Sequence, residues 1–218
     1  MKKYIVPGVS AVYTPLAPGA ETPGTLYFFM GGRRHRATYC LGNVKASLQR
    51  GKIGLFSFDM TGIYVAPDDL ALPTPTLTAY QKPVAFTNQN TTPFTLDGFA
   101  GKFSALTLDS GNVYPYRNLV GSESMRFVDR NSKASVKLED ELVATKDWWA
   151  KLGSGAPVAL SAMHGITAGN IVMIAAPNAQ LDPRDPGIDQ DDNISMLSMS
   201  LLLTPSSAGN DEWSITVK

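Results

Sequence analysis

The stretch VKASLQRGKIGLFSFDMTGIY, residues 44–64, decides the class of the fold. Apolar side chains alternate with polar ones in its first half, a turn at Arg50-Gly51-Lys52 follows, and the returning half alternates again. Because successive side chains of a strand point to opposite faces, this period of two predicts a β-hairpin with one buried and one polar face. The side chains expected on the buried face are Val44, Ala46 and Leu48 in the first strand and Phe56, Phe58 and Met60 in the second.

Similar strand patterns recur along most of the chain. Single strands are predicted at Thr25–Met30, Lys102–Leu108 and Ile171–Ala176. Two further hairpins are predicted, one joining Glu123–Asp129 to Lys133–Glu139 and one joining Ile194–Leu203 to Glu212–Val217. Such a set of strands is typical of a β-sandwich or barrel.

A single short helix is predicted at residues 141–152. Thr145 is a suitable N-cap and Gly153 a suitable stop. Trp148, Trp149 and Leu152 are expected on its buried face, where they would pack against the core. The predicted fold class is therefore all-β with one short α-helix.

The chain divides into an N-terminal arm, residues 1–24, and a β-sandwich domain, residues 25–218. Prolines and glycines interrupt the arm, so neither a helix nor a central strand is expected there. Its apolar residues leave two interpretations open: a tail lying across its own domain, or an arm that docks on a neighbouring subunit. A long loop is predicted at about residues 65–93, and its apolar content favours an ordered loop that packs on something.

Composition excludes several classes of protein. The 218 residues carry 19 Lys plus Arg and 19 Asp plus Glu, and this neutral balance argues against tight nucleic-acid binding through many phosphate contacts. Cys40 is the one cysteine, so no intrachain disulfide can form. Pro7 and Gly8 interrupt the first apolar stretch, so no signal peptide is expected, and no apolar run approaches the length of a membrane helix. Charged residues make up only 17%, which favours self-association.

No set of residues predicts catalysis, a cofactor or a metal site. The two histidines, His35 and His164, have no nucleophile motif beside them, so no catalytic residue is proposed and the protein is expected not to be an enzyme. The basic run Arg33–Arg36 is interpreted as a charged turn rather than a nucleic-acid contact. An acidic cluster, interpreted as a solvated loop rather than a calcium site, contains Asp182, Asp185, Asp189, Asp191 and Asp192.

Three groups of short motifs stand out along the chain. The first lies at residues 42–51, 56–58, 61–69 and 71–73. The second lies at residues 106–112, 116–117 and 121–124, and the third at residues 144–150, 167–170 and 209–217. Together they span most of residues 25–218. In their order and extent, these motifs resemble the tail-tube (major tail) proteins of long-tailed, siphovirus-type bacteriophages.

The resemblance implies a structural virion protein without enzymatic activity. In that family a β-sandwich flanked by a helix forms six-membered rings, hairpins of neighbouring subunits join into one barrel, and the rings stack around a channel that conducts DNA during ejection. Loops and terminal arms bridge successive rings. The implied partners are copies of the chain itself, the tape-measure, terminator and distal tail proteins, and DNA passing without specific binding through a neutral to acidic channel. The implied location is the phage tail, after synthesis in the host cytoplasm.

The contacts between subunits and rings are expected in the arm and in the long loop. The residues expected to make them are Tyr4, Val6, Val12, Tyr13, Asp68, Asp69, Leu70, Leu72, Tyr80 and Phe86. Three alternatives stay open: another tail or baseplate component with the same fold, a monomeric carbohydrate-binding module using Tyr80, Tyr114 and Tyr116, and an enzyme in which His164 has a nucleophile and an acid beside it.

Overall fold

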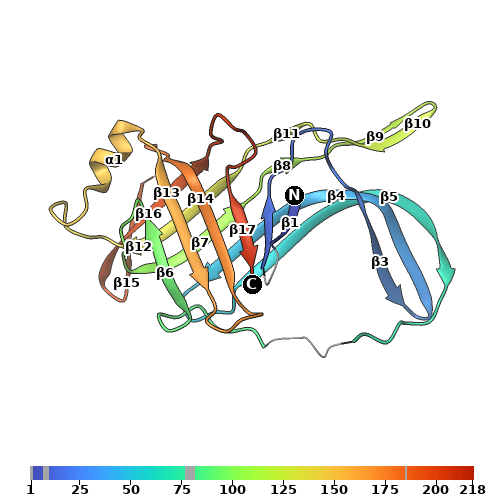
Figure 1. Ribbon diagram of the computed structural model, residues 1–218, viewed down its shortest axis with the longest axis horizontal. Coiled ribbons are helices and arrows are strands. Elements are labelled where there is room, and N and C mark those ends of the chain that lie inside the picture. The colour runs from blue at the N-terminus through green and yellow to red at the C-terminus, as the bar shows by residue number, and fades with distance from the viewer. Residues whose placement is uncertain (1, 7–9, 77–81, 185) are drawn as a thin grey trace.

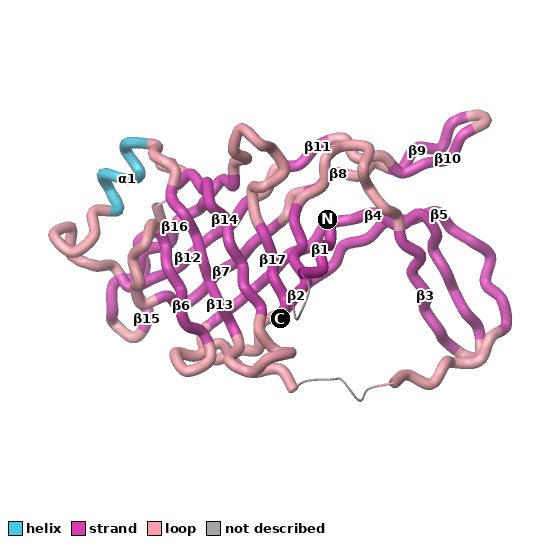
Figure 2. The backbone as a smooth tube through the Cα atoms, viewed as in Figure 1, coloured by secondary structure: helices cyan, strands magenta, loops and turns pink. Residues whose placement is uncertain are grey.

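The computed structural model describes residues 2–6, 10–76, 82–184 and 186–218. These residues are mainly β-strand with one short helix, which confirms the prediction of an all-β fold (Figures 1 and 2). In this described part of the chain, no helix has the length and apolar character that crossing a membrane requires.

Two layers of strands enclose a common hydrophobic core. The first layer has the order β15 (Gly187–Asp191), β16 (Ile194–Leu203), β12 (Lys133–Glu139), β7 (Phe103–Asp109), β4 (Arg33–Gln49) and β5 (Leu55–Asp69). The second has the order β1 (Lys2–Val6), β2 (Ser10–Thr14), β17 (Ser214–Val217), β14 (Val172–Leu181), β13 (Val158–His164) and β6 (Thr91–Leu96). Strand β14 joins the layers, because it pairs with β16 as well as with β13 and β17.

The remaining elements extend from these layers. They are β3 (Gly24–Met30), β8 (Asn112–Val113), β9 (Tyr116–Leu119), β10 (Ser122–Met125), β11 (Asp129–Arg130) and α1 (Trp148–Ser154). Strand β3 pairs with the first half of β4, while β9 and β10 form a separate hairpin and β8 pairs with β11.

Period-two alternation builds the core of the first layer. In β12, Ala134, Val136 and Leu138 are buried and the residues between them are not. In β4 the predicted inward side chains Val44, Ala46 and Leu48 are buried as well. This pattern arises because one face of each strand meets the opposite layer and the other meets solvent.

One of the three predicted hairpins is confirmed and two are wrong. Strands β4 and β5 pair antiparallel with Val44 opposite Phe58, as expected. However, β12 pairs with β7 and β16 rather than with residues 123–129. Strand β16 forms its hairpin with β15, and β17 pairs with β14 and β2. Alternation identifies a strand and its buried face, but the packing of distant segments selects its partners.

The prediction that residues 1–24 hold no central strand is wrong, because β2 lies between β1 and β17. Ser10–Thr14 form β2, which pairs with β17 with Tyr13 opposite Ile215, and Tyr13 packs against the core. The prolines at 15, 18 and 23 all follow this strand, so they do not remove any of its hydrogen-bond donors. This segment therefore lies across its own domain.

The long connection is shorter than predicted. Strand β5 runs to Asp69 and β6 begins at Thr91, so residues 70–90 link them, with an isolated bridge between Ile53 and Ala85. Pro67 stands inside β5 where the register with β4 shifts, a place where a missing N–H donor is tolerated. Of the connection, residues 77–81 lie outside the described residues.

The helix begins and ends later than residues 141–152. Asp147, not Thr145, is the N-cap, because its carboxylate accepts a hydrogen bond from the Ala150 N–H at 2.8 Å. Gly155, not Gly153, ends the helix in the left-handed conformation that glycine adopts without strain. Residues 143–145 form a turn instead.

The predicted buried face of the helix is partly wrong. Trp148 and Leu152 are buried in the core, as expected, but Trp149 is exposed. The helix starts only at Trp148, so the two adjacent tryptophans lie about 100° apart around its axis and cannot share one buried face.

A buried ion pair fastens the end of the N-terminal segment to the domain. Arg130 donates to the Glu212 carboxylate through Nε at 3.1 Å and through Nη2 at 2.6 Å. Its Nη1 donates to the Leu16 carbonyl at 2.9 Å, and Nη2 also reaches Asn210. Both charged side chains are about nine-tenths shielded from solvent. One guanidinium thus joins three segments that are distant in sequence.

We expect Arg130→Met to lower the free energy of unfolding by about 3 kcal/mol, because it leaves the Glu212 carboxylate buried without its counter-charge. Urea titration followed by tryptophan fluorescence measures the change. The matched control is Arg184→Met, which breaks the exposed pair with Asp182 and should cost less than about 1 kcal/mol. Equal effects of the two substitutions would contradict this role of Arg130.

A second cluster holds α1 against the start of the β6–β7 connection. Lys146 and Lys151 approach the Asp97 carboxylate at 2.6 and 3.0 Å, and Lys146 lies 5.1 Å from the Trp148 ring centroid. Burial pushes the pKa of Asp97 up, but the hydrogen bonds from the two lysines outweigh it, and the pKa lies below its ordinary value.

The depressed pKa of Asp97 gives a pH-dependent contribution to stability. It is present above the unfolded pKa of about 3.9 and is lost as the pH falls through the lower folded pKa. We therefore expect wild type to exceed Asp97→Asn in stability at neutral pH, and the difference to vanish in acid. Thermal unfolding across pH measures it, with Asp59→Asn, an exposed carboxylate on β5, as control. A difference that persists unchanged in acid would contradict the assignment.

Candidate functional site

A three-stranded ribbon leaves the sandwich, and among the described residues the strands of the second layer do not extend over it. It consists of β3, residues 33–41 of β4 and residues 61–69 of β5, and it forms the right-hand part of Figure 1. Among the described residues, β3 and β5 each pair only with β4 along the ribbon. Both outer edges of the ribbon therefore present unpaired main-chain groups.

One face of the ribbon continues the core side of the sandwich. Cross-strand partners share a face, so Phe56 and Phe58 lie on the side of the buried Ala46 and Val44. The alternation of β5 carries this side onward through Met60 to Tyr64. Through Ala37 of β4, Tyr64 is in register with Leu26 of β3. This surface, here called the apolar face, comprises Phe56, Phe58, Met60, Tyr64, Leu26, Phe28 and Met30.

The apolar face is open to solvent. Phe58 is 64% exposed and Tyr64 is 75% exposed, and every other member is exposed as well. Soluble monomers rarely leave so many contiguous large apolar side chains uncovered. The prediction that Phe56, Phe58 and Met60 are buried is therefore wrong for the single chain: their side of the strand was predicted correctly, but the second layer does not extend over them.

A β-bulge bends the ribbon away from the sandwich. Between Thr38 and Leu41, strand β4 has one residue more than β5 has between Ile63 and Thr61. Tyr39 takes a φ of 55° at this point. A Cβ at Gly62 would lie 2.9 Å from the Thr38 carbonyl oxygen and still closer to the Cys40 sulfur. Only glycine fits opposite the bulge.

The basic run lies within β4 and not in a turn as predicted, and aspartates of β5 neutralise part of it. Arg34 Nε donates to the Asp68 carboxylate at 3.0 Å, and this hydrogen bond holds the pKa of Asp68 below its ordinary value. Arg33 lies 3.9 Å from Asp69. Arg34 and Asp68 lie on the face opposite the apolar face. Arg33 and Asp69 lie on the same face as Met30, at the end of the ribbon.

The residues expected to contact other subunits fall into different environments. Asp68 and Asp69 end β5, and Leu70 and Leu72 follow it as exposed side chains. Tyr4 and Val6 belong to β1, Val12 is half-buried in β2 beside Tyr13, and Tyr80 lies outside the described residues. Phe86 is only 4% exposed and packs in the core against Phe94, so its side chain is not on the surface.

His164 has a structural environment. The ring is buried, its Nε2 lies 3.1 Å from the Val84 carbonyl and its Nδ1 lies 2.8 Å from the Thr91 hydroxyl. A carbonyl can only accept, so Nε2 donates to Val84. The two contacts of this ring tie β13 to the end of the long connection.

Two of the three tyrosines in the carbohydrate-binding alternative lie among the described residues, and their environments differ. Tyr114 is half-buried and lies 5.5 Å from the Phe127 ring centroid, and burial raises the pKa of Tyr114. Tyr116 is exposed on β9, and its hydroxyl is 2.5 Å from the Glu123 carboxylate.

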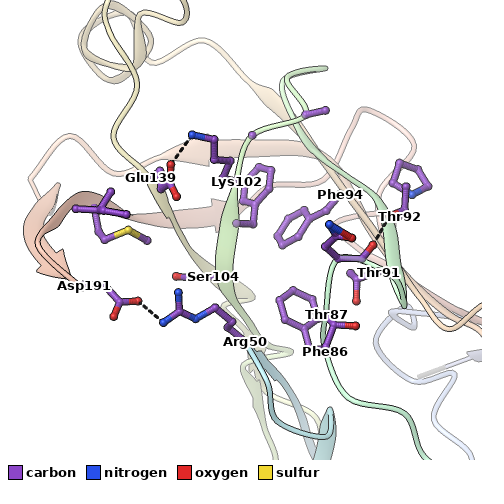
Figure 3. A pocket seen from close by; sticks show the side chains of 17 residues that line it. Arg50, Phe86, Thr87, Thr91, Thr92, Phe94, Lys102, Ser104, Glu139 and Asp191 are labelled. Carbon is purple, nitrogen blue, oxygen red and sulfur yellow. Dashed lines mark hydrogen bonds and ion pairs between the residues drawn. The ribbon is translucent and has the colours of Figure 1, made fainter.

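A cavity of about 580 Å³ opens at the sandwich end formed by the start of β7 and the β15–β16 hairpin (Figure 3). Phe94 and Phe103 stack within it, with ring centroids 3.8 Å apart. Lys102 pairs with Glu139 at 2.6 Å, and Arg50 pairs with Asp191 at 3.2 Å. The cavity thus combines an apolar wall with a rim of paired charges.

The predicted acidic cluster is dispersed among cationic partners. Asp182 pairs with Arg184, Asp189 pairs with Lys137, and Asp191 and Asp192 both pair with Arg50. In residues 2–6, 10–76, 82–184 and 186–218, no three acidic, histidine or cysteine side chains are placed to hold a metal ion. Asp185 lies outside those ranges.

We expect Phe58→Thr to reduce self-association while leaving the unfolding midpoint nearly unchanged, because the side chain is exposed in the single chain and threonine is a good strand former. Sedimentation velocity and thermal unfolding measure the two effects. Ile188→Thr is the matched control, since Ile188 is 63% exposed on the other edge strand of the same layer, β15. Equal loss of association in both variants would contradict a specific role of the apolar face.

Comparison of the sequence with known proteins identifies no relative of this chain. In comparisons with known proteins, neither a family model nor a curated protein matches this chain. The open apolar face and the unpaired ribbon edges are therefore the features that bear most directly on function.

Proposed function

We propose that this protein is a structural subunit that assembles with copies of itself into stacked rings, forming the tail tube of a long-tailed bacteriophage. The observation that carries the proposal is the apolar face, which extends the core side of the sandwich beyond the reach of the second layer in the described part of the chain. Burial of such a surface is a principal driving force of protein association.

The ribbon edges supply the directional part of the contact. The edge of β3 on one copy pairs with the edge of β5 on the next, so that main-chain groups left open in one chain are satisfied between chains. Such a contact joins two different surfaces and is therefore heterologous. Repeated around a closed circle it produces a ring without free edges.

The same arrangement covers the apolar face. A neighbouring sandwich placed beside β5 buries Phe56, Phe58 and Met60 and completes the layer that is missing over them. The ring number of six and the stacking of rings come from the resemblance of the sequence motifs to tail-tube proteins.

The charges of the ribbon suit a conduit for DNA. Arg33 and Arg34 have Asp69 and Asp68 beside them, so two of the three ribbon arginines are offset within the chain. A wall of unpaired arginines would bind phosphates at every ring and hold the passing duplex. A surface on which arginines are balanced by aspartates holds the DNA duplex less tightly, so the duplex can slide past it.

Negative-stain electron microscopy of the purified protein tests the proposal. We expect hollow rings or tubes at high protein concentration, and their loss in the double variant Met30→Lys, Tyr64→Lys, which places charge on both edge strands of the ribbon. Ile188→Lys on β15 is the matched control and should assemble. A wild-type chain that remains monomeric at every concentration, or a double variant that forms normal tubes, would reject it.

A further inference from the structure

The hairpin of β9 and β10 ends in an exposed apolar tip. Leu119 pairs with Ser122, so Val120 and Gly121 form the turn, and Gly121 takes a φ of 82°. Val120 is fully exposed and Leu119 is more than half exposed. Turns of this kind are ordinarily built from polar residues and glycine. The valine and the leucine there lie outside the hydrophobic core of the single chain.

The cavity of Figure 3 has an apolar wall that could receive an apolar side chain. Its wall includes Phe94, Phe103 and the buried Met196, while the charges at its rim are neutralised by Arg50–Asp191 and Lys102–Glu139 pairs. A charged ligand would have to compete with these pairs. An uncharged apolar group gains burial without disturbing them.

The hairpin tip and the cavity belong to opposite ends of the molecule. In Figure 1 the longest axis is horizontal, the β9–β10 hairpin reaches the right-hand end, and β15 and β6, which border the cavity, lie at the left. The tip of one chain therefore cannot fill the cavity of the same chain.

We propose that the Leu119–Val120 tip of one copy inserts into this cavity on a second copy. The charges of the two surfaces support this occupant: residues 118–122 carry none, and among the described residues the charged side chains at the rim of the cavity are all paired, so an uncharged tip meets no unpaired charge there. The contact is heterologous and repeats along an assembly. It rests on the proposed self-assembly but is a contact distinct from that of the ribbon.

Site-directed disulfide formation tests the contact. Ala100 lines the cavity and is exposed, and the native Cys40 is buried. Mixing Val120→Cys with Ala100→Cys should give a cross-linked dimer under mild oxidation. Mixing Leu142→Cys with Ala100→Cys should not, because Leu142, although also an exposed apolar residue, lies outside the hairpin. Equal cross-linking in both mixtures, or none in either, would overturn the proposal.

A charged residue introduced at the hairpin tip provides a second test, which measures the strength of association. Val120→Asp should weaken association about tenfold, the effect of losing the burial of one apolar side chain, while Leu142→Asp should not. Tubes that form normally with Val120→Asp overturn this contact and leave the proposed function standing. A specific disulfide in a chain that never forms tubes supports the contact and rejects the proposed function.

Binding of an uncharged fluorescent probe, N-phenyl-1-naphthylamine, tests whether the cavity is filled in the assembly. We expect the probe to bind the cavity in monomers and to be excluded from it in assemblies. Equal binding in both states shows a small-ligand site and overturns the contact.

Discussion

The structure depends on a difference in extent between its two layers: the first layer extends beyond the edge of the second layer that covers it. Alternating side chains give the first layer an apolar side, and the second layer covers that side only as far as β4. Beyond it, Phe56, Phe58 and Met60 keep the inward orientation of core residues but meet solvent. Hydrophobic burial that cannot be completed within a chain favours completion by another chain, because the gain scales with the apolar area removed from water.

The individual strands and their faces could be predicted from the sequence, but their partners could not. Val136 and Leu138 are buried as their alternation indicates, whereas β12 lies between β7 and β16 instead of pairing with the preceding segment. Register and partner choice depend on how distant segments pack, and local alternation carries no information about that. Strand β2 is not predicted, because prolines precede and follow it closely in the sequence. The five residues of the strand itself contain no proline.

The candidate site was only half predictable for a related reason. The period of two placed Phe58 on the correct side of its strand, but exposure depends on whether a second layer lies opposite, which the pattern of one strand does not specify. The unbroken apolar run Leu26–Met30 was the available signal, because a strand that is apolar on both faces has more apolar surface than a single layer can cover.

The bulge at Tyr39 and Gly62 has a geometric consequence for a closed assembly. The bend is fixed by main-chain atoms in close approach, and a side chain at position 62 would push the two strands apart. In a circle of identical copies, the angle between body and ribbon sets the curvature and hence the diameter of the opening. In the proposed ring, the close approach at Gly62 would then be one determinant of the calibre of the whole particle.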